Sequence, residues 1–201
     1  MWSRILGSMP LVDHADSLLV VIDAQEGFYG GDGLPASDGD RAREALARMT
    51  WLARVARRLR VPAVLTEEDP DRNGETFAPI AGLFPSSPAL VKPTFGLTGT
   101  PEIIEQVERA GRGTAVLVGF ETDVCVAQSA IGLSDRGMRV VVVEDAVFSP
   151  GEMHARGLAR MTAEGVELNH CKGLAYEWTR TLGESRSVLH DPEVGEAPFR
   201  L

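Results

Sequence analysis

Cys125 stands a few residues after a run of apolar, β-forming residues, in the segment GFETDVCVAQSAIG (119–132), and a helix-like pattern follows it. In the first turn of a helix, unpaired backbone N–H groups and the helix dipole stabilise a thiolate and lower its pKa. The same N–H groups could hold an oxyanion beside the sulfur, as acyl transfer to a thiol requires. Free cysteines are also among the most buried residue types and usually only pack. The position of Cys125 therefore leaves both a reactive and a structural thiol open.

Two further charged residues lie in unusually apolar surroundings. Asp23 ends the apolar run of LLVVIDAQEGF, where a carboxylate is poorly placed for packing but could accept a proton, or could cap a loop. Lys92 lies in ALVKPTFG, an apolar segment stiffened by proline, where a lysine either meets a partner charge or extends its head group into water. A thiol, a carboxylate and an ammonium together could supply a nucleophile, a proton shuttle and a stabilising charge.

The elements that must position these residues alternate along the chain. Short apolar runs predict strands, and amphipathic segments predict helices. The predicted strands are 17–23, 61–67, 114–120, 138–146 and 166–168, and the predicted helices are 38–60, 101–110, 123–136, 149–163 and 172–182. Continuous apolar strands alternating with helices indicate an α/β fold, an open and mostly parallel sheet flanked by helices on both faces. In such sheets ligands bind at the carboxyl ends of the strands, where Asp23 and Cys125 are expected.

The segments outside this pattern carry more local predictions. Residues 68–99 contain five prolines and several glycines, so a long irregular loop with a functional role is expected there. The sequence Ser149-Pro150-Gly151-Glu152 has the form of a capping box that opens a helix. The polar tail from 184 is expected to be loosely held. The whole chain, 1–201, is expected to be a single domain with its core at about 15–183.

Composition excludes several classes of protein. The 201 residues are 44% hydrophobic and 24% charged, with a formal net charge of −9, which disfavours nucleic acid and anionic membranes as partners. No apolar run approaches the ~18–20 residues of a membrane span, and MWSRILGSMP lacks the apolar stretch of a signal peptide. Two cysteines do not make a disulfide framework. We therefore expect a cytoplasmic protein with both thiols free.

Three segments together carry a family resemblance. VVIDAQEGF, VKPTFG and VGFETDVCV, in this order and with these separations, resemble the isochorismatase-like cysteine hydrolases, a superfamily that includes nicotinamidase, N-carbamoylsarcosine amidase and ureidoacrylate amidohydrolase. The similarity covers roughly residues 15–180. It implies a Rossmann-like three-layer fold.

The resemblance also implies roles for individual residues. Cys125 would attack the carbonyl of an amide, carbamoyl or ureido group. Asp23 would take the thiol proton and deliver it to the departing nitrogen, while Lys92 would hold the Asp23 carboxylate, keep it ionised and stabilise negative charge. Members of the superfamily have a non-proline cis peptide at the position of Phe120–Glu121, which would turn the Glu121 N–H toward the Cys125 N–H to make an oxyanion hole.

Three further residues are candidates for the substrate pocket. Phe28 matches a pocket-lining position of the superfamily, although a plain core role fits its type almost as well. Gln25 and Phe95 are candidates because they lie near Asp23 and Lys92 in the sequence. The small-molecule substrate is expected to be bound by a homo-oligomer, a dimer or tetramer, because members of the superfamily commonly associate.

The sequence departs from the nicotinamidase pattern. Nicotinamidases carry an Asp-x-His pair and a further histidine that bind a divalent metal after the second strand, whereas this chain has LTEEDPDRNGETF and no histidine between His14 and His154. The acidic residues of this segment could in principle bind a hard cation, but a solvated acidic loop is expected: Glu67, Glu68, Asp69 and Asp71. We predict no metal and no cofactor, and nicotinamide becomes a disfavoured substrate. Cys171 matches no motif and is interpreted as structural.

The leading hypothesis is a metal-independent cysteine hydrolase that cleaves the C–N bond of a small amide, carbamoyl or ureido substrate through a thioester. One alternative is a non-catalytic binding or scaffold protein with the same fold. Another is a vinyl ether hydrolase of the isochorismate-cleaving type, several of which lack the nucleophilic cysteine. A thiol redox protein is disfavoured because the chain has no CxxC motif.

Overall fold

The computed structural model describes residues 10–29 and 36–201, and its centre is a six-stranded parallel sheet with strand order β3-β2-β1-β4-β5-β6. The strands are β1 (Ser17–Ile22), β2 (Ala63–Glu67), β3 (Leu90–Val91), β4 (Thr114–Phe120), β5 (Arg139–Phe148) and β6 (Glu167–Asn169). The α-helices are α1 (Ala36–Arg58), α2 (Pro70–Asn73), α3 (Ala78–Ala81), α4 (Pro101–Arg109), α5 (Ala127–Asp135), α6 (Met153–Ala163), α7 (Cys171–Thr179) and α8 (Leu182–Leu189). The predicted α/β class is confirmed.

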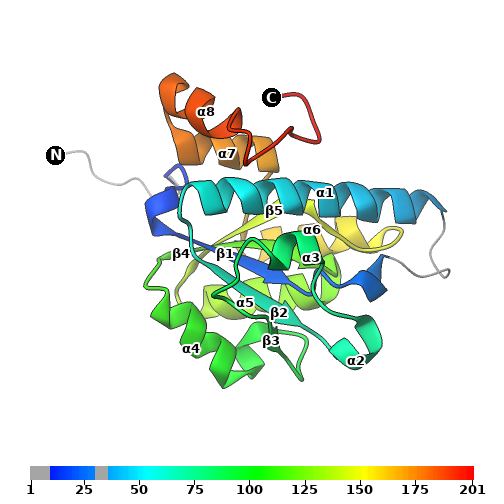
Figure 1. The fold of residues 1–201 in the computed structure, drawn as a ribbon. Coiled ribbons are helices and arrows are strands. Elements are labelled where there is room, and N and C mark those ends of the chain that lie inside the picture. The colour runs from blue at the N-terminus through cyan, green and yellow to red at the C-terminus, as the bar shows by residue number, and fades with distance from the viewer. Residues whose placement is uncertain (1–9, 30–35) are drawn as a thin grey trace.

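Both faces of the sheet are covered, which explains the continuous apolar strands. Leu19 and Val21 of β1 pack into one core cluster with residues of α1 and α7, while Leu18, Val20 and Ile22 pack into a second cluster with residues of α4, α5 and α6. Figure 1 shows α1, α7 and α8 on one side of the sheet and α4 and α5 on the other. Because side chains of a strand alternate between faces, a strand buried on both faces needs an apolar residue at every position.

The chain reverses its direction of travel across the sheet at β1. From β1 it runs outward through β2 to the edge strand β3, and it then returns to the opposite side of β1 as β4. A parallel sheet opens a crevice at such a switch point, outside the carboxyl ends of the two strands. The segments that follow β1, β2, β3 and β4 therefore meet at one edge of the sheet.

Two local predictions, for the loop 68–99 and for the capping box at Ser149, are wrong. The loop 68–99 is not irregular throughout, since it contains α2, α3, β3 and a 3₁₀ turn at Leu97–Gly99. The capping box at Ser149 does not form: α6 begins at Met153, its N-cap residue Glu152 makes no capping hydrogen bond, and the Ser149 hydroxyl donates instead to Asp123 Oδ1 at 2.6 Å. The Ser149 hydroxyl thus bonds to the carboxylate of Asp123, which is distant in the sequence, and not to the start of the helix that follows it.

The tail from 184 is packed rather than loosely held. Residues 182–189 form α8, and Val188, Leu189 and Val194 are buried in the cluster on the α1 side of the sheet. The ring of Phe199 packs edge-on against Trp51 of α1 with ring centroids 5.0 Å apart. The few apolar residues of this segment are thus buried in the same core cluster as residues of α1.

No α-helix in the described parts of the chain, 10–29 and 36–201, combines the length and apolarity that crossing a bilayer requires.

Gly119 allows the ends of β1 and β4 to approach closely. It pairs with Ile22 in the register of the two strands and has a φ of +132°, and a Cβ at this position would lie 1.9 Å from the Ile22 carbonyl oxygen. No other residue type fits without moving the backbone. The close approach brings the residue after β1, Asp23, beside the segment that follows β4.

We expect Gly119→Ala to lower the free energy of unfolding by about 2–5 kcal/mol, because it adds backbone overlap to the cost of a positive φ. Gly137→Ala is the matched control, since Gly137 has a φ of +87° but no atom within 4 Å of the added Cβ. It should cost only about 1–2 kcal/mol. Urea unfolding of both variants measures the difference, and equal losses would contradict the close-approach argument.

Candidate active site

Asp23 is the first residue after β1, and its conformation turns its carboxylate into the crevice. Its φ is +49°, a left-handed conformation that aspartate tolerates better than most residues. Its N–H donates to the Thr66 carbonyl at 3.1 Å, and its Oδ1 accepts a hydrogen bond from the Thr66 hydroxyl at 2.9 Å. Hydrogen bonds thus link both the main chain and the side chain of Asp23 to Thr66 in β2.

Lys92 follows β3 and points inward although it lies at the edge of the sheet. Its N–H donates to the Glu67 carbonyl at 2.9 Å, which continues the pairing of β3 with β2. The neighbouring Val91 is 55% exposed while Lys92 is 1% exposed, as the alternation of an extended segment requires. The Lys92 Nζ lies 2.7 Å from Asp23 Oδ2, and both side chains are fully buried.

Cys125 lies in a π-helical turn, η4 (Thr122–Val126), rather than in the first turn of an α-helix as the sequence predicted. The Val126 N–H donates to the Glu121 carbonyl at 3.0 Å, the i→i+5 bond of such a turn. The Cys125 carbonyl accepts a hydrogen bond from the Ser129 hydroxyl at 2.6 Å. Turns of this kind are frequent at functional sites because they redirect individual side chains.

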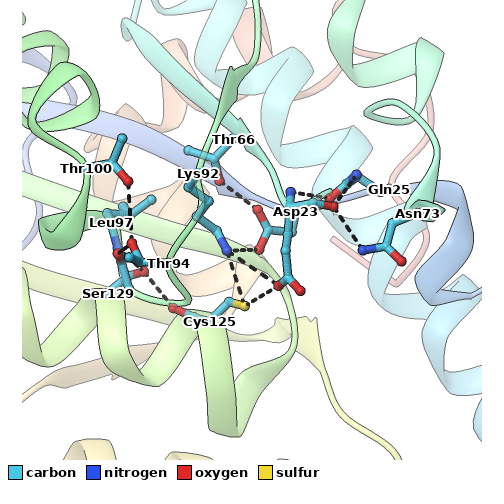
Figure 2. A network of polar contacts seen from close by, with 12 residues as sticks. Asp23, Gln25, Thr66, Asn73, Lys92, Thr94, Leu97, Thr100, Cys125 and Ser129 are labelled. Atoms are coloured by element: carbon cyan, nitrogen blue, oxygen red, sulfur yellow. Dashed lines mark hydrogen bonds and ion pairs between the residues drawn. The ribbon is translucent and has the colours of Figure 1, made fainter. Parts of the chain in front are cut away.

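The sulfur, the ammonium and the carboxylate come together at the carboxyl edge of the sheet (Figure 2). The Lys92 Nζ lies 3.4 Å from Cys125 Sγ. A carboxylate oxygen of Asp23 lies within 4.8 Å of the same sulfur. Cys125 is 2% exposed, so all three groups are removed from water. The structure thus brings Asp23, Lys92 and Cys125 into one contact group although 33 to 69 residues separate neighbouring members in the sequence.

Glu68 is a fourth member of this group that the sequence analysis did not assign to it. Its Oε2 lies 3.3 Å from Cys125 Sγ and 3.6 Å from Lys92 Nζ, and its side chain is 27% exposed. It follows β2 directly, so its place at the end of a strand beside the switch point was a signal available in the sequence. Glu68 was not recognised as a site residue because it stands among other acidic residues, and such a cluster is typical of a solvated loop.

Gln25 holds the segment that carries Glu68 rather than offering its amide to a ligand. Its Oε1 accepts from the Glu68 N–H at 2.8 Å, and its Nε2 donates to the carbonyls of Glu68 at 3.1 Å and Gly74 at 2.6 Å. Glu67 is similarly occupied, since its Oε1 accepts from the N–H and the hydroxyl of Thr76 at 2.7 and 2.8 Å. The hydrogen bonds of Gln25 and Glu67 thus fix the conformation of the segment 67–76.

The two aromatic pocket candidates lie differently. Phe28 is half-buried in a 3₁₀ turn (Glu26–Phe28) and packs against the core cluster on the α1 side, which fits the core role left open for it. Phe95 is 52% exposed, three residues after Lys92. Their contact with a substrate stays a prediction.

Burial dominates the protonation of the site. Burial and the nearby Asp23 carboxylate raise the pKa of Cys125, and the Lys92 ammonium offsets only part of this rise. Burial also raises the pKa of Asp23 above its usual value, against the opposing effect of Lys92. Burial lowers the pKa of Lys92, but the attraction of Asp23 outweighs it, so the net shift is upward.

These shifts bear on two expectations. Burial and the nearby Asp23 carboxylate raise the pKa of the Cys125 thiol, whereas its place after β4 was expected to lower it. Beside Lys92 the pKa of the Asp23 carboxyl is still raised, because desolvation outweighs the attraction of the ammonium. A protonated sulfur next to a carboxylate of raised proton affinity favours transfer of the proton when the thiol reacts.

The segment before Cys125 carries the proposed oxyanion donors. The Phe120–Glu121 peptide bond is cis. Within the described residues, the Glu121 N–H donates no hydrogen bond to a protein acceptor. Its use as an oxyanion donor together with the Cys125 N–H stays a prediction.

The acidic and sulfur groups do not form a convincing metal site. Donor atoms of Asp23, Glu68 and Cys125 lie within 4.8 Å of one another. The Lys92 ammonium, however, contacts all three of them, at 2.7, 3.6 and 3.4 Å. A divalent cation among these donors would stand against a buried positive charge at close range, which is strongly unfavourable. The donor set fits the ammonium, and no step of the chemistry is assigned to a metal.

The sheet, its switch point and the buried thiol, carboxylate and ammonium define a class of α/β proteins with a polar centre at the carboxyl edge. The isochorismatase domain model matches residues 17–170. The chain therefore belongs to the isochorismatase family, a family of hydrolases.

Curated relatives and solved structures agree with this membership. Isochorismatase domain-containing protein 2 of Bos taurus is 32% identical over 139 residues, which are 67% of this chain and 65% of that protein. YcaC from Pseudomonas aeruginosa, in a structure with hexane-2,5-diol and covalent acrylamide, has a TM-score of 0.78 at 24% identity and covers 93% of this chain and 95% of its own. YcaC from Escherichia coli, described as an octameric hydrolase of unknown specificity, has a TM-score of 0.76 at 23% identity with the same coverage. At these identities the two structures show a common fold.

We expect alkylation of Cys125 by iodoacetamide in the resting protein to keep accelerating as pH rises beyond 9. The reason is that its raised pKa leaves the thiol protonated at neutral pH and the thiolate fraction grows with each step in pH. Mass spectrometry of the labelled peptides separates Cys125 from the fully buried Cys171. A rate that levels off below pH 8 would instead indicate a lowered thiol pKa.

Lys92→Met should lower the free energy of unfolding by about 3–5 kcal/mol at neutral pH, because it leaves the buried Asp23 carboxylate unpaired. The folded-state pKa of Asp23 is raised above its unfolded value, so this loss shrinks as pH falls and the carboxyl becomes protonated. Adding Asp23→Asn should recover much of the loss.

Lys172→Met is the control for Lys92→Met. Its ammonium reaches only the carbonyl of Arg200 at the surface, so its removal should change the stability by no more than about 0.5 kcal/mol. Urea unfolding at pH 5 and pH 8 measures all of these variants. If Lys92→Met were as stable as the wild type at pH 8, the ion pair would not be needed to keep Asp23 buried.

Proposed function

We propose that this protein is a metal-independent cysteine hydrolase that cleaves the C–N bond of a small amide, carbamoyl or ureido substrate through a thioester. The observation that carries the proposal is the mutual contact of Cys125, Lys92 and Asp23 in a buried group at the switch point of the sheet. Ion pairs as deeply buried as this one are costly, and such polar groups gather at functional sites. A thiol held among them is poorly explained by packing alone.

Acylation needs a nucleophile, a base and donors for the oxyanion. Asp23 takes the proton from the Cys125 thiol as Sγ attacks the substrate carbonyl carbon, and the Lys92 ammonium at 3.4 Å stabilises the negative charge that develops on sulfur. The carbonyl oxygen becomes an oxyanion that accepts from the N–H groups of Glu121 and Cys125. When the tetrahedral intermediate collapses, the C–N bond breaks and Asp23 returns its proton to the departing nitrogen.

Deacylation reverses the roles. Asp23, again ionised, removes a proton from a water molecule that attacks the thioester carbonyl, and the same two N–H groups stabilise the second oxyanion. The C–S bond breaks, and the proton on Asp23 returns to the sulfur. A carboxylate of raised pKa suits this double role, because its proton affinity is closer to those of the groups with which it exchanges protons.

The relatives support this class of chemistry without defining the substrate. The Escherichia coli YcaC structure is described as a hydrolase of unknown specificity. The retained Cys125 favours amide-type substrates over vinyl ethers, since only the former need a nucleophilic sulfur.

We also propose that the active form is a homo-oligomer, as the octameric Escherichia coli YcaC suggests. The exposed apolar side chains of Val91 and Phe95 flank Lys92 at the edge of the sheet and would be covered by such an assembly. Light scattering coupled to gel filtration measures the mass, and a monomer at micromolar concentration would contradict this proposal.

Cys125→Ala should abolish ammonia release from a panel of small amides, carbamoyl compounds and ureas while the fold is preserved. Asp23→Asn should reduce kcat by about 10²–10⁴-fold, because it removes the proton shuttle but keeps the size and most hydrogen bonds of the side chain. Cys171→Ala is the matched control, since that thiol packs against α1 away from the site, and it should leave turnover unchanged. A Cys125→Ala variant that still releases ammonia would refute the mechanism.

Wild-type protein that releases no ammonia across the panel, with a Cys125 no more reactive than Cys171, would favour the binding or scaffold protein that the sequence left open. Thermal shift with the same panel would then identify a bound compound without requiring turnover.

A further inference from the structure

Glu68 is the member of the polar group that faces solvent. Asp23 and Lys92 have fully buried side chains and Cys125 is 2% exposed, whereas the Glu68 side chain is 27% exposed. Its Oε2 contacts the sulfur directly at 3.3 Å. Of the four groups, Glu68 is therefore the one that a ligand in solvent can contact.

Hydrogen bonds hold the main chain of Glu68 in place, and this limits where its carboxylate can lie. The N–H of Glu68 donates to Gln25 Oε1 at 2.8 Å, and its carbonyl accepts from Gln25 Nε2 at 3.1 Å and from Asn73 Nδ2 at 2.9 Å. Gln25 is itself fully buried. Because the main chain of Glu68 is held on both sides by side chains, its carboxylate is a built part of the site rather than one of many positions of a mobile loop.

The balance of charge around the sulfur is negative. Two carboxylates, Asp23 and Glu68, share a single ammonium, and Lys92 lies closer to Asp23 (2.7 Å) than to Glu68 (3.6 Å). Burial, Asp123 and Glu68 together raise the pKa of Glu121, so the field of Glu68 also extends to the residue proposed to bind the oxyanion. A second anion brought to this place would be repelled by Glu68, while a cation or an N–H donor would be attracted.

We propose that Glu68 determines substrate specificity: its carboxylate accepts an N–H donor or a cationic group of the substrate beside the scissile carbonyl and discriminates against substrates with an anionic group there. This inference rests on the function proposed above and narrows it. The favoured substrates are amides, carbamoyl compounds or ureas with an N–H group next to the carbonyl and no carboxylate adjacent to it. A tertiary amide would leave the carboxylate desolvated without a donor and would also be disfavoured.

The test measures the charge preference of Cys125 without requiring any turnover. Three methanethiosulfonates of similar size carry an ammonium group, no charge, or a sulfonate group. In each reaction the Cys125 thiolate attacks the reagent, a disulfide bond forms, and methanesulfinate leaves. The ratio of the ammonium rate to the sulfonate rate reports the charge seen at the sulfur. It is independent of the pKa of Cys125, because the same thiolate attacks every reagent.

Wild-type protein should prefer the ammonium reagent, and Glu68→Gln should reduce the rate ratio by about fivefold or more, the effect of one unit charge at about 4 Å even in fully aqueous surroundings. Glu68→Asp should keep the preference because it keeps the charge. Glu75→Gln removes a charge from an exposed residue of the same segment that has no hydrogen bond or ion pair to the described members of the site, and it should leave the ratio unchanged. Cys125→Ala measures the background from Cys171.

An unchanged ratio in Glu68→Gln, or an equal fall in Glu75→Gln, would overturn the proposal. Circular dichroism and urea unfolding establish that each variant is folded. The two proposals fail separately: an enzyme that releases ammonia but whose charge preference ignores Glu68 refutes only the specificity role. If the panel of amides identifies a substrate, Glu68→Gln should raise KM for N–H-bearing substrates more than it lowers kcat.

Discussion

The ion pair between Lys92 and Asp23 is the constraint on which the rest of the site depends. Its atoms are 2.7 Å apart, and neither side chain is exposed to solvent. The desolvation of such a pair costs several kcal/mol per ion, and only close contact with additional hydrogen bonds offsets it. Thr66 supplies one of these bonds to Asp23 Oδ1. The pair therefore holds only if the ends of β1, β2 and β3 are fixed relative to one another.

The same burial determines how the thiol can react. Desolvation raises the pKa of both Cys125 and Asp23, so the resting site avoids a buried negative charge on the sulfur. In the proposed mechanism, transfer of the thiol proton to Asp23 becomes favourable when the sulfur gains a bond to carbon. That transfer leaves the net charge of the group unchanged, and the Lys92 ammonium lies close enough to both Asp23 and Cys125 to stabilise the negative charge at either place. The proposed mechanism thus does not require a thiol of low pKa in the resting protein.

The sequence predicted those parts of the structure that depend on repeated local patterns. The longer strands β1, β2, β4 and β5 were found because burial on both faces imposes continuous apolar runs such as Leu18–Ile22. The two residues of β3 were missed because so short a strand shows no periodicity and one of its residues, Val91, is exposed. The capping box at Ser149 failed because Asp123, 26 residues earlier, competes for the same hydroxyl. Such long-range competition leaves no local trace in a sequence.

For the site, the prediction was good where residue type is rare in its context and poor where it is common. An aspartate and a lysine are unusual in apolar runs, so the sequence predicted Asp23 and Lys92 as site residues. Glu68 stands among other acidic residues, and its distinct role arises from Gln25, which binds its main chain on both sides. The four groups, Asp23, Lys92, Cys125 and Glu68, differ in their exposure to solvent, and we expect their roles to differ accordingly. The three buried groups are shielded from water and suited to bond making, whereas Glu68 alone among them reaches solvent, where charge can select a ligand before reaction.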